Sequence, residues 1–206
     1  MKNIRTILSI LAVMVVVGLS QAVLWGASGP NLVTIDRLQA AYRVEINAEA
    51  RYSAFAVKAD EEGYKQVANL FRAVARSEQI QYTGAFDTIK ALGGTPENVN
   101  PAEAPVGNTK ENLEKSSDKA ALEQMDSDFA SHAKAAHGEG NRDAAKVFEA
   151  VRLVEAQNFR LFSAAAKSLE SMRGTPRGYF LCGVTGFVST NMDAMNCSSP
   201  DWEKVK

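Results

Sequence analysis

The sequence repeats itself in its central part, and this repeat constrains the fold more than any other feature. The segment 62–71 (EGYKQVANLF) matches the segment 139–148 (EGNRDAAKVF), and Gly63 and Gly140 hold equivalent positions 77 residues apart. The same offset relates three further pairs: Val74 and Val151, Glu78 and Glu155, Gln81 and Asn158. Solenoid repeats are shorter, at about 20 to 50 residues. A period of this length instead suits a duplicated pair of helices.

Apolar residues recur at alternating steps of three and four around both segments, which indicates helices with one core-facing stripe. We expect four helices, at about 34–60, 63–92, 110–137 and 141–172. Gly63 and Gly140 would lie in tight turns within each helical hairpin. The stretch 93–107 contains Pro96, Pro101 and Pro105 and is expected to form a long crossover. Two helical hairpins joined by one long crossover predict an all-α, ferritin-like four-helix bundle.

Polar residues stand on these stripes at positions where core residues are expected. They are Glu78 and Gln81 on the second helix, Glu155 and Asn158 on the fourth, and Glu45 and Glu123 on the first and third. A buried carboxylate is costly unless it is paired, protonated or bound to a metal. Di-iron carboxylate bundles take a Glu from each of two helices and a Glu-x-x-His pair from each of the other two. Here both histidines are replaced by amides.

Several motifs resemble those of the rubrerythrin family. The segment 45–52 (EINAEARY) is similar to the family's first-helix motif E-x-x-A-x-x-R-Y, and 108–113 (NTKENL) is similar to the entry into its third helix. The resemblance covers about residues 34–206 and implies a carboxylate-bridged di-iron site that reduces hydrogen peroxide. The two glutamates of the family's third helix fall at Ala120 and Glu123, so the first of them is replaced.

The resemblance also implies a set of metal ligands. These are Glu45, Glu78, Glu123 and Glu155, with Gln81 and Asn158 at substituted positions. The expected cofactor is iron, as a di-iron centre, or manganese, held more weakly than in the family because amide oxygens are neutral ligands. The alternative is that protonated glutamates and the two amides form hydrogen bonds without a metal. The expected function is peroxide reduction in oxidative-stress defence, and the alternative is a non-catalytic scaffold or binding protein.

The N-terminal segment has the pattern of an export signal. Lys2 and Arg5 precede an apolar run, and small residues at 20 and 22 suit a cleavage site. We therefore expect residues 1–22 to be a signal peptide, or alternatively a membrane anchor that extends to about residue 27. A cleaved signal peptide would place the protein in the periplasm or outside the cell. An uncleaved anchor would attach the exported protein to the inner membrane.

Charge and family analogy limit the partners. The formal net charge is −1, which argues against nucleic-acid binding because nucleic-acid binders carry a basic face. Members of the rubrerythrin family commonly dimerise, so we expect a homodimer by analogy. The sequence does not identify the electron donor.

The C-terminal segment resembles a rubredoxin domain that has lost half of its metal ligands. The bundle is expected over 34–172, and a small β-rich appendage over 177–206. In the first knuckle, C-x-x-C-G-Y-V, Thr185 replaces the second cysteine, and in the second knuckle, C-x-x-C-x-x-P, Ala194 replaces the first. Two thiolates do not complete a four-coordinate site, so no rubredoxin-type iron is expected.

Each knuckle of the resemblance keeps one cysteine, Cys182 in the first and Cys197 in the second. Two neighbouring thiols in an exported protein meet an oxidising compartment, where disulfides form and persist. We therefore predict a disulfide between Cys182 and Cys197.

Overall fold

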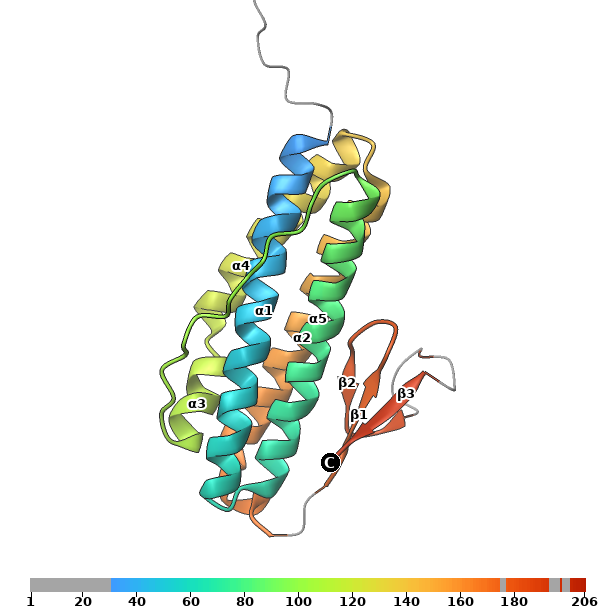
Figure 1. The fold of residues 1–206 in the computed structure, drawn as a ribbon. Coiled ribbons are helices and arrows are strands. Elements are labelled where there is room, and N and C mark those ends of the chain that lie inside the picture. The colour runs from blue at the N-terminus through green and yellow to red at the C-terminus, as the bar shows by residue number, and fades with distance from the viewer. Residues whose placement is uncertain (1–30, 175–176, 193–196, 198–200) are drawn as a thin grey trace, which may run out of the picture.

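The protein is a long helical bundle with a small sheet at its side (Figure 1). The computed structural model describes residues 31–174, 177–192, 197 and 201–206, so the predicted signal segment 1–22 lies outside it. The helices are α1 (Leu32–Glu61), α2 (Lys65–Ala91), α3 (Thr109–Ser116), α4 (Lys119–Gly138) and α5 (Arg142–Lys167). Within the described part of the chain, no helix is long and apolar enough to span a membrane.

Two helical hairpins form the bundle, as the repeat predicts. The α1–α2 turn contains Gly63 and the α4–α5 turn contains Gly140, with φ angles of 81° and 80°. A side chain at such φ values is strained, so glycine suits both turns. The segment between α2 and α3 runs back along the bundle (Figure 1) and is held to α1, where Gln39 Nε2 donates to the Thr95 carbonyl oxygen over 2.7 Å. The ferritin-like bundle with one long crossover is thereby confirmed.

The prediction of one continuous third helix over 110–137 is wrong. The structure divides it into α3 and α4, with a break at Ser117 and Asp118. The Asp118 carboxylate caps α4 and accepts hydrogen bonds from the backbone N–H groups of Ala120 and Ala121. Aspartate is among the best N-cap residues because its side chain satisfies N–H groups that have no partner in the helix. The break resets the helical phase, which changes the direction in which the residues of α4 point.

Aromatic side chains fill the core on either side of the polar residues. Around one end of the bundle, the Phe71 ring centroid lies 5.5 Å from that of Phe55 and 5.3 Å from that of Phe162. Tyr52 stacks on the same group at 6.1 Å from Phe71. A second cluster, around Phe148, occupies the other end. The two clusters correspond to the apolar stripes of the repeat.

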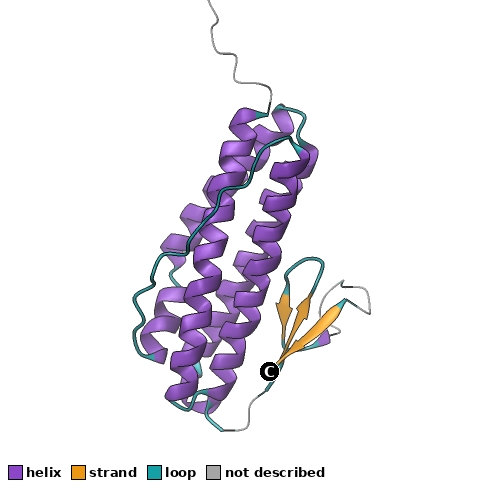
Figure 2. Cartoon of the chain, viewed as in Figure 1, coloured by secondary structure: helices purple, strands orange, loops and turns teal. Residues whose placement is uncertain are grey.

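The C-terminal strands lie against α2 at one side of the bundle (Figure 2). After the short helix η1 (Leu169–Met172), the antiparallel sheet has the order β2-β1-β3, with β1 (Tyr179–Cys182), β2 (Val188–Ser189) and β3 (Trp202–Val205). The predicted Cys182–Cys197 disulfide is present. Ala194 lies outside the described residues. The small β-rich appendage is therefore confirmed as a fold.

Replacement of Phe71 by alanine should destabilise the bundle by about 3–5 kcal/mol, because it removes a fully buried ring and leaves a cavity. The matched control is Val57→Ala on the exposed side of α1, where the residue is 59% exposed. That change should stay within about 0.5 kcal/mol. Chemical denaturation followed by circular dichroism measures both values. Equal effects of the two substitutions would contradict the assignment of the core.

Candidate metal centre

Three carboxylates from three helices meet inside the bundle. Glu45 comes from α1, Glu78 from α2 and Glu155 from α5, and one oxygen atom of each lies within 4.8 Å of the others. Glu45 and Glu78 are buried, whereas Glu155 is partly accessible. The helical stripes place them here because each glutamate occupies a core position of its helix.

Several oxygen atoms at this centre have no hydrogen-bond donor. They are Oε1 of Glu45, Oε2 of Glu78 and Oδ1 of Asn158, all buried. The Asn158 amide instead donates through Nδ2 to Oε1 of Glu78 over 3.3 Å. Buried oxygens without partners are costly, and carboxylate and amide oxygens are the ligands that hard cations prefer. These carboxylate and amide oxygens therefore fit a bound cation, and the cluster is consistent with a di-iron site.

Burial changes the protonation of the three carboxyl groups. Loss of hydration raises the pKa of Glu45 to about 8, and the nearby charge of Glu155 adds to the effect. Burial also raises the pKa of Glu78 well above its ordinary value, with the charges of Glu155 and Glu45 contributing. The pKa of Glu155 is raised by burial and is lowered in part by Glu78 and Arg51. Without a cation, the centre therefore retains protons at neutral pH.

The structure does not bring Glu123, the predicted ligand on the third helix, to this centre. Its side chain is 65% exposed and pairs with Lys119, with 2.9 Å between Oε1 and Nζ. The helix break at Asp118 is the physical reason, because α4 begins there with its own phase and presents Glu123 to solvent. The prediction that Glu123 faces inward is wrong.

Gln81 is buried but is bound to the C-terminal appendage. Its Nε2 donates to the carbonyl oxygen of Thr185 over 3.1 Å, and the neighbouring Ser77 hydroxyl donates to the carbonyl of Gly186 over 2.5 Å. A Cβ atom at Gly186 would lie 2.5 Å from Gln81 Nε2, so glycine permits this close approach. Asn158 is therefore the one predicted amide that contacts the carboxylates, through Glu78.

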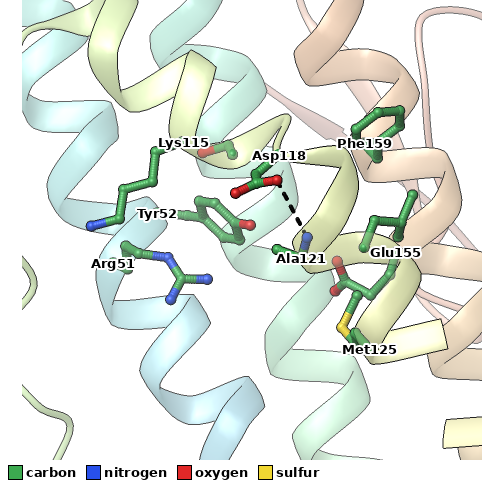
Figure 3. Close-up of a pocket in the computed structure, with 10 residues that line it drawn as sticks. Arg51, Tyr52, Lys115, Asp118, Ala121, Met125, Glu155 and Phe159 are labelled. Carbon is green, nitrogen blue, oxygen red and sulfur yellow. Dashed lines mark hydrogen bonds between the residues drawn. The ribbon is translucent and has the colours of Figure 1, made fainter. Parts of the chain in front are cut away.

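The sequence did not predict a role for Arg51 or a pocket beside the centre. A pocket of about 330 Å³ lies between α1, α3, α4 and α5 and reaches Glu155. Figure 3 shows Arg51 and Lys115 on one side of it, Glu155 and Met125 on the other, and Tyr52 between them. The R-Y pair of the 45–52 motif was the available signal for Arg51 and Tyr52. The pocket itself depends on the helix break, which the periodicity did not reveal.

The fold and the centre define the class of protein: a ferritin-like four-helix bundle with a carboxylate cluster between its helices. The family model for rubrerythrin matches residues 36–167, and the chain belongs to the rubrerythrin family. Nigerythrin of Nitratidesulfovibrio vulgaris is 27% identical over 164 residues, which cover 80% of each chain. Rubrerythrin of Porphyromonas gingivalis is 29% identical over 165 residues, 78% of this chain and 81% of that protein.

Solved structures agree with this assignment. The structure of a mixed-valence state of nigerythrin has a TM-score of 0.73 at 25% identity and covers 83% of this chain and 86% of its own. A bacterioferritin of Desulfovibrio desulfuricans has a TM-score of 0.65 at 18% identity, over 71% of this chain and 90% of its own, and supports the fold alone.

The free energy of unfolding of the metal-free protein should fall by a few kcal/mol as the pH rises from about 5.5 to about 8. The reason is that folding raises the pKa of Glu45 to about 8, so the folded state binds more protons than the unfolded state within this window. Glu45→Gln should reduce the slope, while other titrating groups such as His132 remain unchanged. Urea denaturation with chelator present measures the slope. A constant or rising stability in the parent protein would contradict the buried, protonated centre.

Proposed function

We propose that this protein binds iron or manganese at Glu45, Glu78 and Glu155 and reduces peroxide in oxidative-stress defence. The observation that supports the proposal is the convergence of three carboxylates inside the bundle, two of them buried, each of these two with an oxygen that has no hydrogen-bond donor. Membership of the rubrerythrin family and similarity to the mixed-valence structure of nigerythrin support the choice of a redox-active metal.

The residues of the chain have distinct parts in this proposal. The three carboxylates would hold the metal, and Oδ1 of Asn158 would supply a further neutral oxygen. A bound iron or manganese ion would supply electrons for the reduction of peroxide. Tyr52 lies beside the cluster, and burial, together with the charges of Glu155 and Glu78, raises its pKa, so its hydroxyl keeps its proton at neutral pH. Tyr52 can therefore donate a hydrogen bond to a small molecule in the pocket.

We also propose export of the protein and the absence of rubredoxin-type iron. The basic and apolar pattern of residues 1–22 supports export, and so does the disulfide, because disulfides persist in oxidising compartments. The disulfide uses Cys182 and Cys197, and Thr185 offers no thiolate, which together support the loss of the rubredoxin metal.

The alternative function is that of a non-catalytic scaffold whose carboxylate centre binds no metal. One hydrogen bond at the centre favours this alternative. The Asn158 amide donates to Glu78, as it would in a centre closed by hydrogen bonds. In that case the raised pKa values of Glu45 and Glu78 would keep the site protonated, and added metal would leave the stability unchanged.

Glu78→Gln should weaken the binding of iron or manganese by at least about tenfold, because it removes one carboxylate ligand and keeps the shape of the side chain. Elemental analysis after anaerobic loading and desalting measures bound metal. The matched control is Glu123→Gln, which removes an exposed carboxylate of α4 and should leave metal binding unchanged. Loss of metal in the control, or retention in Glu78→Gln, would contradict the assigned centre.

The iron-loaded, reduced protein should consume hydrogen peroxide, and Glu78→Gln should slow this reaction on the order of a hundredfold. The expected loss follows from removing one charged group at the reacting centre. Stopped-flow spectroscopy after removal of excess reductant measures the rate, with Glu123→Gln as control. A metal-loaded protein that leaves peroxide intact would rule out the peroxidase proposal without ruling out metal binding.

A further inference from the structure

The pocket beside the carboxylate cluster has features that metal binding does not explain. It lies where α3 ends and α4 begins, so the break at Ser117 and Asp118 opens the bundle at this point. Within the described residues, the cluster draws carboxylates from α1, α2 and α5 alone. The pocket thus lies on the α4 side of the centre, and the described residues of α4 add no carboxylate to the cluster.

Two cationic side chains on the pocket wall form no ion pair among the described residues, although the charge of Arg51 opposes the rise in the pKa of Glu45 and Glu155. Arg51 and Lys115 form no ion pair within 4.0 Å with any acidic group in the ranges that the structure describes. Arg51 instead lies over the Tyr52 ring, 4.9 Å from its centroid. The wall has two acidic residues, Asp118 and Glu155. Asp118 already accepts hydrogen bonds from the backbone N–H groups at the start of α4, and Glu155 belongs to the carboxylate cluster. The wall can therefore accept an anion.

The size and lining of the pocket indicate an organic anion. Its volume of about 330 Å³ far exceeds the roughly 30 Å³ that one water molecule occupies in the liquid. It falls at the lower end of the range of small-molecule sites. Leu122, Met125 and Phe159 supply an apolar surface beside the two cations. A pocket with a basic edge and an apolar wall matches a carboxylate attached to a short hydrocarbon chain.

We propose that this pocket binds a short-chain monocarboxylate, with the carboxylate group at Arg51 and Lys115 and the hydrocarbon chain against Leu122, Met125 and Phe159. Glu155 borders the same pocket, and its negative charge opposes an incoming anion. A cation held by Glu155 cancels that charge. Metal and carboxylate should therefore bind cooperatively, and this coupling, unlike the binding itself, rests on the proposed metal function.

Isothermal titration calorimetry with butyrate tests the binding in metal-free protein. Lys115→Gln should weaken butyrate binding by about tenfold, the loss expected for one charge-assisted hydrogen bond. The matched control is Lys110→Gln, an exposed lysine on the same helix that pairs with Glu114, and it should bind butyrate like the parent protein. Glu155→Gln should tighten binding, because it removes the opposing charge. Inorganic phosphate and acetate serve as comparison anions.

The possible results test butyrate binding in the pocket independently of metal binding. The proposal is supported if butyrate binds more tightly than acetate or phosphate and if Lys115→Gln weakens that binding. No butyrate binding in Glu155→Gln, or equal binding in Lys115→Gln, overturns it, and a preference for phosphate overturns the class of ligand. Saturating Mn²⁺ should tighten butyrate binding by about fivefold or more. If Mn²⁺ does not bind, the proposed function fails, whereas the metal-free titrations still decide the pocket.

Discussion

The meeting of three carboxylates inside the bundle determines what the surrounding helices must tolerate. Glu45, Glu78 and Glu155 share one small volume, where ionised groups repel one another and lose hydration. The protein can relieve this cost by retaining protons or by binding a cation. The raised pKa values of Glu45 and Glu78 favour the retention of protons. The buried oxygens without hydrogen-bond donors favour the binding of a cation. Aromatic packing on both sides of the cluster supplies the stability that tolerates this cost.

The sequence predicts most of the bundle because its signals are local. The repeat and the apolar stripes give the hairpins, and the two turn glycines fall where the chain reverses. Three of the four predicted glutamates meet because they lie on long, uninterrupted helices. Glu123 does not reach the cluster because the N-cap Asp118 restarts the helix in another phase at α4. This local preference outweighs the continuous apolar stripe. Gln81 is buried as its stripe predicts, but its amide donates to Thr185, a residue distant in sequence, and periodicity does not report such contacts.

The C-terminal appendage is a small three-stranded sheet that packs against the bundle. The disulfide joins the two remaining cysteines and closes the end of the sheet. Hydrogen bonds from Ser77 and Gln81 hold the first knuckle against α2, on either side of Glu78 in the sequence. The appendage therefore supports the helix that carries the central carboxylate. These hydrogen bonds connect the 182–188 segment of the appendage to the helix that carries Glu78.

Anomalous X-ray diffraction can show whether the three carboxylates form a cation site. Crystals of the Mn²⁺-loaded protein would be measured above and below the manganese absorption edge. We expect an anomalous peak among Glu45, Glu78 and Glu155, with none beside Glu123. A fully loaded crystal whose anomalous peaks lie only elsewhere, or that shows none, would mean that the three carboxylates do not bind the cation.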